Sequence, residues 1–292
     1  MQGSAREDQA FAIQLSRLAV RSLHAELRLY PKPGLVSLVD NGSHQDMTAA
    51  TFVRSLFSLR HYFAGITLAG MQALPFKHLK LLGMRAEQRM LRATGGINTH
   101  RGAIFSLGML AAATGYCKRR SIPLTAASIR AALLIQWGDE LALHSRPAIA
   151  MAAPTAASHG MRVAEQYAAS GAREEAAMGF PSVFEVAMPR LCAALEAGRS
   201  MEEAQMDALF ALIAHISDTN LYHRGGPAGA ALARQSAQKF LDSGATANPQ
   251  WRDKALRAHR LFVQHRLSPG GAADLLAATC MLHQCMQTPE DD

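Results

Sequence analysis

Five polar clusters interrupt an otherwise apolar sequence, and each stands beside glycine or proline. They cover residues 25–47, 95–102, 171–181, 217–226 and 266–276. The clusters contain carboxylates, amides, arginines and histidines, which are the side chains that bind phosphate groups or a divalent cation. Any one of them is ordinary turn chemistry, but five in a chain with only 18% charged residues indicate helix ends that converge on a polar pocket.

The first cluster places an acidic residue where an apolar one is expected. On a helical wheel, Glu26 falls on the apolar face of the first expected helix, where a carboxylate is costly unless something pairs with it. Ser43 and Asp46 match a capping box, and a helix cap is the favoured interpretation of Asp46 alone. Capping does not explain why Lys32 and His44 stand nearby, whereas a metal or a cationic substrate group would.

The second cluster, "GGINTHRG", precedes a long apolar segment. Gly95 and Gly96 allow positive φ and a close approach of the backbone to a ligand. The N–H groups of the helix that follows would bind an anion, and the Arg101 guanidinium would strengthen that contact. Alternatively, Asn98 or Thr99 only caps a core helix. The residues alone leave both interpretations open.

The fourth cluster, "SDTNLYHRGG", offers hard oxygen ligands. Asp218 and Asn220 suit Mg²⁺, and Arg224 follows Asn220 by one helical turn. Gly225 and Gly226 are expected to end the helix. The alternative is a solvent-exposed helix end with a glycine C-cap.

The composition is that of a large helical protein. The chain has 292 residues, of which 49% are hydrophobic and only 6% aromatic, so small aliphatic side chains are expected to pack helices closely. Its formal charge is +7, but the basic residues are spread thinly and no aromatic residues alternate with them. No nucleic-acid partner is therefore expected.

The cysteines and the apolar segments indicate a soluble, cytoplasmic protein with no membrane contact. Cys117, Cys192, Cys280 and Cys285 show no metal-binding spacing and are expected to be reduced thiols. The first residues lack the apolar core of a signal peptide. The longest apolar run, residues 102–116, is too short to span a bilayer.

Helical periodicity dominates the chain, and no alternating strand pattern is found. The fold class expected is all-α, with a single compact multi-helix domain over residues 1–292 whose tails, 1–7 and 287–292, are frayed. Its polar helix-end loops should converge on a nucleotide pocket. Helices are expected near residues 8–29, 48–70, 78–93, 99–116, 125–143, 157–170, 182–197, 201–216, 227–243, 249–266 and 271–286.

The polar segments also resemble a known family. "YPKPGLV", "GSHQDM", "TGGINTHRGAIFSLG", "GAREEAAMGFPSV", "SDTNLYHRGG" and "LSPGGAADLL" follow one another as in the triphosphoribosyl-dephospho-coenzyme A synthases. The resemblance covers roughly residues 23–283. One departure is Glu174, where many relatives have glycine, so a tight backbone role at that position is in doubt.

The resemblance implies an all-α pentosyltransferase that converts ATP and 3′-dephospho-CoA to 2′-(5″-triphosphoribosyl)-3′-dephospho-CoA and releases adenine. It implies an α-linked product made from a β-nucleoside, which fits one inverting displacement. A separate transferase would attach the product to the acyl carrier protein of malonate decarboxylase or citrate lyase. The sequences of three segments, "SHGMRVAEQY", "GAREEAAMGFPSV" and "LYHRGG", are more similar to the malonate decarboxylase branch. The oligomeric state is not fixed by the sequence, and a homodimer is one candidate.

With that chemistry, the clusters receive roles. Carboxylates near the anomeric carbon would stabilise developing positive charge and take the acceptor's proton, and Mg²⁺ would accompany ATP. The catalytic candidates are Glu26 and Asp46, and the metal candidates are Asp46, Glu175 and Asp218. The candidates for binding nucleotide or phosphate are Lys32, Gly95, Gly96, Asn98, Thr99, His100, Arg101, Asn220, Arg224, Ser268, Gly270 and Gly271.

Two other functions fit the same residues. A helical Mg²⁺-dependent hydrolase of ADP-ribosyl or nucleotide bonds would use similar acidic helix ends, with water in place of the acceptor hydroxyl. A non-catalytic helical partner of the carrier protein would release no adenine at all.

Overall fold

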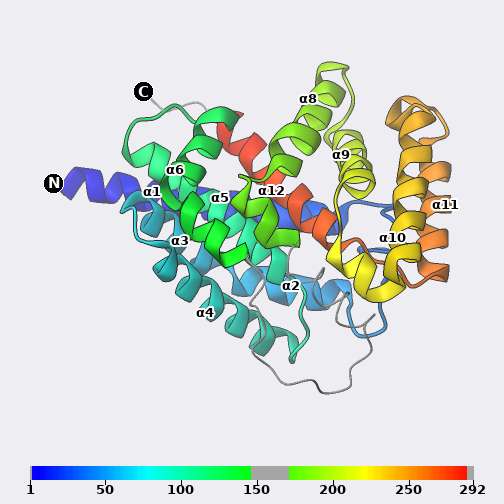
Figure 1. Cartoon of the computed structure of the whole chain (residues 1–292), viewed down its shortest axis with the longest axis horizontal. Coiled ribbons are helices and arrows are strands. Elements are labelled where there is room, and N and C mark those ends of the chain that lie inside the picture. The colour runs from blue at the N-terminus through cyan, green and yellow to red at the C-terminus, as the bar shows by residue number, and fades with distance from the viewer. Residues whose placement is uncertain (1, 146–170, 288–292) are drawn as a thin grey trace.

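The computed structural model describes residues 2–145 and 171–287, and throughout these residues the regular structure is helical, with no strand (Figure 1). The all-α prediction is confirmed. The elements are α1 (Gln2–Arg28), α2 (Ala49–Ser58), α3 (Arg60–Met71), α4 (Phe76–Thr94), α5 (Arg101–Arg119), α6 (Ala126–Ser145), η1 (Ser182–Ala187), α8 (Met188–Glu196), α9 (Met201–His215), α10 (Thr219–Asp242), η2 (Ala245–Ala247), α11 (Trp251–Gln264) and α12 (Gly270–Gln287).

The core is built around two helices, α5 and α12, that are buried along most of their length. Glycine lets α3 lie against α5 almost backbone to backbone. A Cβ on Gly70 would lie 2.0 Å from the Ala112 carbonyl oxygen, and one on Gly115 would lie 2.4 Å from that of Thr67. The close packing expected from the small-residue composition is therefore present.

The N-terminal third differs from the sequence predictions at its helix boundaries. The helix expected over residues 48–70 is two helices, α2 and α3, which meet at Leu59. The capping box of α2 is formed by Thr48 and Thr51, so the prediction that Ser43 and Asp46 form it was wrong. The N-cap residue, Thr48, lies five residues further along the chain than that pattern implied, which leaves Asp46 exposed in the preceding loop.

The glycines of the fourth cluster bend a helix where they were expected to end it. Gly226, with φ 59° and ψ −164°, interrupts the helical geometry inside α10. The helix resumes directly, so α10 begins at Thr219 rather than near residue 227. A positive φ is accessible to glycine at little cost, and Pro227 can start a new helical turn because its missing N–H has no partner there.

The ends of the chain were only partly predicted. Helix α1 begins at Gln2, so residues 2–7 are helical and not a frayed tail. The predicted helix over residues 157–170 lies outside the described residues. Among the helices that the structure describes, none has the length and apolarity needed to cross a membrane.

Candidate active site

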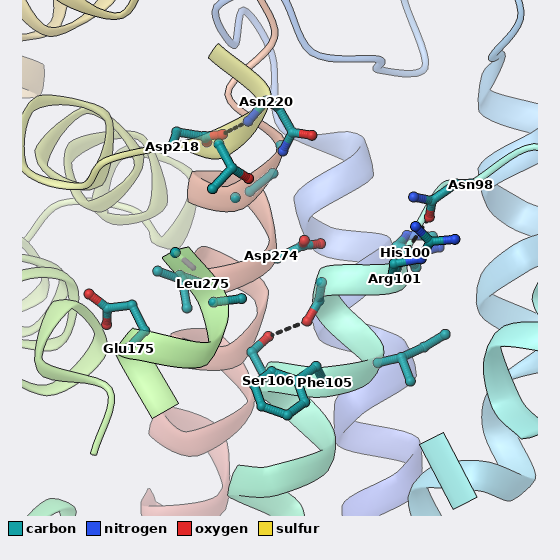
Figure 2. Close-up of a pocket in the computed structure, with 18 of the residues that line it drawn as sticks. Asn98, His100, Arg101, Phe105, Ser106, Glu175, Asp218, Asn220, Asp274 and Leu275 are labelled. Atoms are coloured by element: carbon teal, nitrogen blue, oxygen red, sulfur yellow. Dashed lines mark hydrogen bonds between the residues drawn. The ribbon is translucent and has the colours of Figure 1, made fainter. Parts of the chain in front are cut away.

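One large cavity, of about 1080 Å³, gathers side chains from all five polar clusters. Its polar wall is made by the end of α1, the loop before α2, and the first turns of α5, α10 and α12. Figure 2 shows Asp274 between Asp218 and Asn220 on one side and Asn98, His100 and Arg101 on another. The cavity exceeds the roughly 300–1,000 Å³ typical of a site for one small ligand, so it has room for two substrates.

Glu26 lines this cavity and is buried, with 6% of its surface exposed. The ammonium of Lys32, itself buried, contacts Glu26 Oε1 and donates a second hydrogen bond to the Glu26 carbonyl oxygen at 2.7 Å. Burial lowers the pKa of Lys32, and the Glu26 carboxylate opposes that effect. The charge partner that the apolar position of Glu26 required is therefore Lys32.

Asp218 joins the first turns of two helices. One carboxylate oxygen accepts from the Asn220 N–H of α10 at 2.9 Å, and the other accepts from the Ala272 N–H of α12 at 3.0 Å. Burial raises its pKa, and these hydrogen bonds partly offset the rise. Gly271 permits the approach, because a Cβ there would lie 3.1 Å from Asp218 Oδ2. Asp218 is thus the buried N-cap of α10, and the alternative of a solvent-exposed helix end with a glycine C-cap was wrong.

Asp274 is a third carboxyl group in the cavity, and it is not among the residues predicted from the sequence. It lies on α12 and accepts a hydrogen bond from the Ala103 backbone in the first turn of α5. Its Oδ2 lies 2.1 Å from where a Cβ of Gly102 would be, so only glycine at 102 leaves room for this carboxyl group. Burial and the neighbouring charges of Glu26 and Asp218 raise the pKa of Asp274 well above its usual range.

Glu26, Asp218 and Asp274 together form what we call the carboxylate cluster. A signal for Asp274 was present in the sequence: it is the only acidic residue of a largely apolar helix, α12. What the sequence could not show is that α12 meets the first turn of α5, because the two are far apart in the chain.

His100 is the N-cap residue of α5 and is held by a chain of hydroxyl groups. The Thr99 hydroxyl donates to Ser55 Oγ at 2.6 Å, and Ser55 Oγ lies 2.6 Å from His100 Nδ1. The Ser55 proton is then free for Nδ1, which leaves the hydrogen on Nε2, an atom with no partner among the described residues. Burial and Lys32 lower the pKa of His100 to about 3, so the ring is neutral.

A second chain links three segments of the cavity wall. The Arg224 guanidinium donates to His44 Nδ1 at 2.9 Å, and His44 Nε2 lies 2.8 Å from Ser268 Oγ. Because guanidinium only donates, His44 must carry its hydrogen on Nε2 and donate it to Ser268. The Ser268 hydroxyl proton is thereby left for a ligand. Burial and Arg224 lower the pKa of His44 to about 4.

The comparisons with known proteins agree with one another. A family model described as ATP:dephospho-CoA triphosphoribosyl transferase matches residues 12–291. The chain belongs to this family. A relative from Acinetobacter calcoaceticus named probable 2-(5″-triphosphoribosyl)-3′-dephosphocoenzyme-A synthase is 40% identical over 93% of this chain and 90% of its own length. A synthase of the same name from Pectobacterium atrosepticum, without "probable", is 35% identical over 93% of this chain and 89% of its own. No solved structure matches the chain.

In this transferase, the residues of segment 95–101 that were predicted to bind nucleotide or phosphate occupy different positions relative to the cavity. His100, and neither Asn98 nor Thr99, is the N-cap residue of α5. Asn98 lines the cavity, and its Oδ1 accepts from the Arg101 N–H of the first turn at 3.2 Å. Arg101 is exposed and paired with Glu87 at 2.5 Å. Gly95 and Gly96 have φ of 70° and 90° and end α4. They are not among the residues that line the cavity.

The three predicted metal candidates do not come together in the transferase. Asp46 is exposed and does not line the cavity. Glu175 lines it, but its carboxylate accepts from the Ser182 hydroxyl at 2.6 Å and from the Ser182 N–H at 3.2 Å, which caps the π-helix η1. No group of three or more histidine, cysteine, aspartate or glutamate side chains within residues 2–145 and 171–287 is arranged to hold a metal ion. The predicted set therefore does not fit a preformed Mg²⁺ site.

Proposed function

We propose that this enzyme converts ATP and 3′-dephospho-CoA to 2′-(5″-triphosphoribosyl)-3′-dephospho-CoA and releases adenine. The observation that carries the proposal is the carboxylate cluster, which lies in a cavity large enough for both substrates and lined by the cations that phosphate groups require. Family membership supports the same reaction.

The reaction exchanges one bond at the anomeric carbon of ATP. The bond from C1′ to adenine N9 breaks, and a bond from C1′ to the acceptor ribose oxygen forms. The acceptor hydroxyl loses a proton, and the departing adenine gains one. Two carboxyl groups in different environments suit these opposite tasks, one ionised and one protonated.

We assign the proton acceptor to Glu26 and the proton donor to Asp274. Lys32 holds Glu26 as a carboxylate, which also stabilises positive charge at C1′. The raised pKa of Asp274 keeps a proton there to give to adenine. Lys32 lies behind Glu26 and is buried, so we propose that it positions Glu26 rather than binding phosphate. Asp46, which lies outside the cavity, receives no catalytic role.

We assign the phosphate contacts to groups whose donors face the cavity. Arg224 and the Ser268 hydroxyl proton stand on one wall with Asn220, Gly270 and Gly271, and Arg101 stands at the start of α5. His100 supplies a neutral N–H donor. We propose that Mg²⁺ enters as the counter-ion of the ATP triphosphate, because the candidate protein ligands are apart or already bonded.

We further propose that the product serves the acyl carrier protein of malonate decarboxylase, after a separate transferase attaches it. Support comes from the amino-acid sequence of residues 171–183 and 221–226, which is more similar to that branch. The four cysteines are unpaired, as in reducing compartments, and this supports a cytoplasmic enzyme. Because the product is the same for both branches, the branch is tested by deleting the gene for this enzyme in its host and measuring which carrier protein loses its prosthetic group; loss from the lyase carrier alone contradicts the assignment.

The reaction is tested with purified protein, ATP, Mg²⁺ and dephospho-CoA, with adenine and the conjugate followed by chromatography and mass spectrometry. We expect one adenine per conjugate, and none without dephospho-CoA. Adenine released without acceptor would identify a hydrolase instead. No adenine under any metal condition would leave a non-catalytic partner of the carrier protein.

A further inference from the structure

Part of the cavity lining is apolar, and it includes residues of α4, α5 and α6. In Figure 2, Phe105 lies across Asp274 from Asp218 and Asn220. The His144 ring of α6 lies 6.3 Å from the Phe105 ring and 5.3 Å from the Phe76 ring, measured between centroids. We call this part of the cavity the apolar arm, and its lining is Phe76, Leu79, Met84, Phe105, Met109 and His144.

The apolar arm is held open by hydrogen bonds between α6 and the segment that starts α4. The Glu140 carboxylate accepts from the Phe76 N–H at 3.0 Å, and the Trp137 indole donates to the Leu74 carbonyl oxygen at 2.9 Å. The first contact satisfies an N–H of the first turn of α4, which has no intrahelical partner, and the second satisfies a carbonyl oxygen of the loop that precedes the helix. The arm therefore exists before a ligand arrives.

Two exposed cations flank the same place. Lys80 and Arg173 line the cavity. The pKa of His144 is lowered mainly by burial and further by the charges of Arg173 and Lys80. An apolar arm with positive charge beside it suits a ligand that has a long uncharged tail joined to phosphate groups. ATP has no such tail, whereas dephospho-CoA carries pantetheine on a diphosphate.

We infer that the apolar arm binds the pantetheine of dephospho-CoA, with Lys80 and Arg173 at its diphosphate; this rests on the function proposed above. The assignment places the two substrates on opposite sides of Asp274. The triphosphate of ATP then lies toward Arg224 and Ser268, and the acceptor enters over α4. Its ribose hydroxyl and the anomeric carbon of ATP meet at the carboxylate cluster.

Met84 offers a test that leaves the core intact, because 50% of its surface is exposed although it lines the cavity. Leu81, on the same helix, is 43% exposed and does not line the cavity, so it provides a matched control. We expect Met84→Glu to raise the KM for dephospho-CoA about tenfold, because a carboxylate replaces apolar contact area and repels phosphate. The KM for ATP should stay within about twofold, and Leu81→Glu should change neither.

A fragment of the acceptor identifies which part of it binds. We expect 4′-phosphopantetheine to inhibit competitively against dephospho-CoA and not against ATP, and Met84→Glu to weaken that inhibition. A rise in the KM for ATP, or inhibition competitive with ATP, would overturn the inference by placing ATP in the apolar arm. Unchanged constants in Met84→Glu would overturn it as well.

The inference and the proposed function fail in different ways. If the wild-type protein releases no adenine, the reaction is wrong, and calorimetric titration with dephospho-CoA alone still tests the apolar arm. Weaker binding by Met84→Glu but not by Leu81→Glu supports the arm, and equal binding by all three proteins overturns it.

Discussion

The cavity has two kinds of charged wall, and they are built differently. The carboxylate cluster is held by the protein itself: Glu26 by Lys32, Asp218 by two helix starts, and Asp274 by the first turn of α5. We call the exposed cavity-lining cations Lys80, Arg101, Arg173 and Arg224 the basic rim.

This difference separates chemistry from substrate capture. Groups that move protons must be fixed before the substrate arrives, because preorganised groups need no rearrangement during the reaction. Cations at the exposed rim have only to attract the phosphate chain of a substrate. Substitutions in the carboxylate cluster should therefore lower kcat or stability, and substitutions in the basic rim should raise KM.

The largest effect is expected from removing the partner of the buried carboxylate. Lys32→Met leaves Glu26 with an uncompensated charge away from water, which costs about 3–5 kcal/mol when a buried pair is broken. Urea unfolding followed by circular dichroism measures the free energy of unfolding. Lys77→Met, at an exposed position, is the control. A loss below about 1 kcal/mol would show that Lys32 and Glu26 are not a buried pair.

A smaller effect should follow from crowding Asp274 without changing it. The new Cβ of Gly102→Ala would meet Asp274 Oδ2, so the carboxyl group must move, and we expect kcat to fall about 10- to 100-fold. Gly83→Ala is the matched control on a cavity-lining helix, because its Cβ finds nothing nearer than 3.7 Å. Equal activity of the two variants would contradict the placement of Asp274.

Stability should also depend on pH through the buried neutral histidines. The pKa of His100 is lowered to about 3 by burial and Lys32, so below about pH 6.5 the unfolded chain binds a proton that the folded protein does not. The free energy of unfolding therefore decreases as the pH is lowered below about 6.5, by up to about 1.4 kcal/mol per pH unit for this histidine.

The variant that isolates this effect is His100→Asn, whose amide oxygen can still accept from Ser55. We expect its free energy of unfolding to vary less between pH 6.5 and 4 than that of the wild type. His78→Asn, at an exposed position of α4, serves as the control. An unchanged slope in His100→Asn would show that His100 is protonated in the folded protein.

The smallest effect is expected in the basic rim. Arg101→Ala removes an exposed ion pair with Glu87, which contributes less than about 1 kcal/mol to stability. We expect the KM for dephospho-CoA to rise about threefold to tenfold at unchanged kcat, because Arg101 lies beside Glu87 of α4, over which the acceptor enters. Initial rates at varied dephospho-CoA measure this, with Arg85→Ala, exposed and outside the cavity lining, as the control. A drop in kcat alone would place Arg101 among the groups that act on the reacting atoms.

Local patterns predicted local structure well. Helical periodicity gave the all-α class, and the inward position of Glu26 revealed a buried charge. Asp46 shows the limit of predicting a helix start from a motif. A capping motif was present at Ser43 and Asp46, but Thr48 caps the helix instead, since several residues of a loop can serve as a cap. The kink at Gly226 is similar, because glycine permits a break without deciding whether the helix continues.

The site itself depended on contacts that sequence spacing does not encode. Glu175 was expected at a metal, yet it caps η1, because Ser182 lies within reach once the chain folds back. Asp274 was missed because Gly102, which leaves room for its carboxyl group, and Ala103, which donates to it, are distant in the chain. Gly95 and Gly96 were predicted to lie close to a ligand, whereas in the structure they adopt positive φ angles at the end of α4.

The most direct test of the central assignment is the rate of adenine release by Asp274→Asn. With saturating ATP, Mg²⁺ and dephospho-CoA, we expect kcat to fall about 10²- to 10⁴-fold, with both KM values nearly unchanged and the free energy of unfolding no lower than in the wild type. A kcat within about twofold of the wild type, in a protein that folds normally, would show that Asp274 does not protonate adenine and that the carboxylate cluster is not the reaction centre.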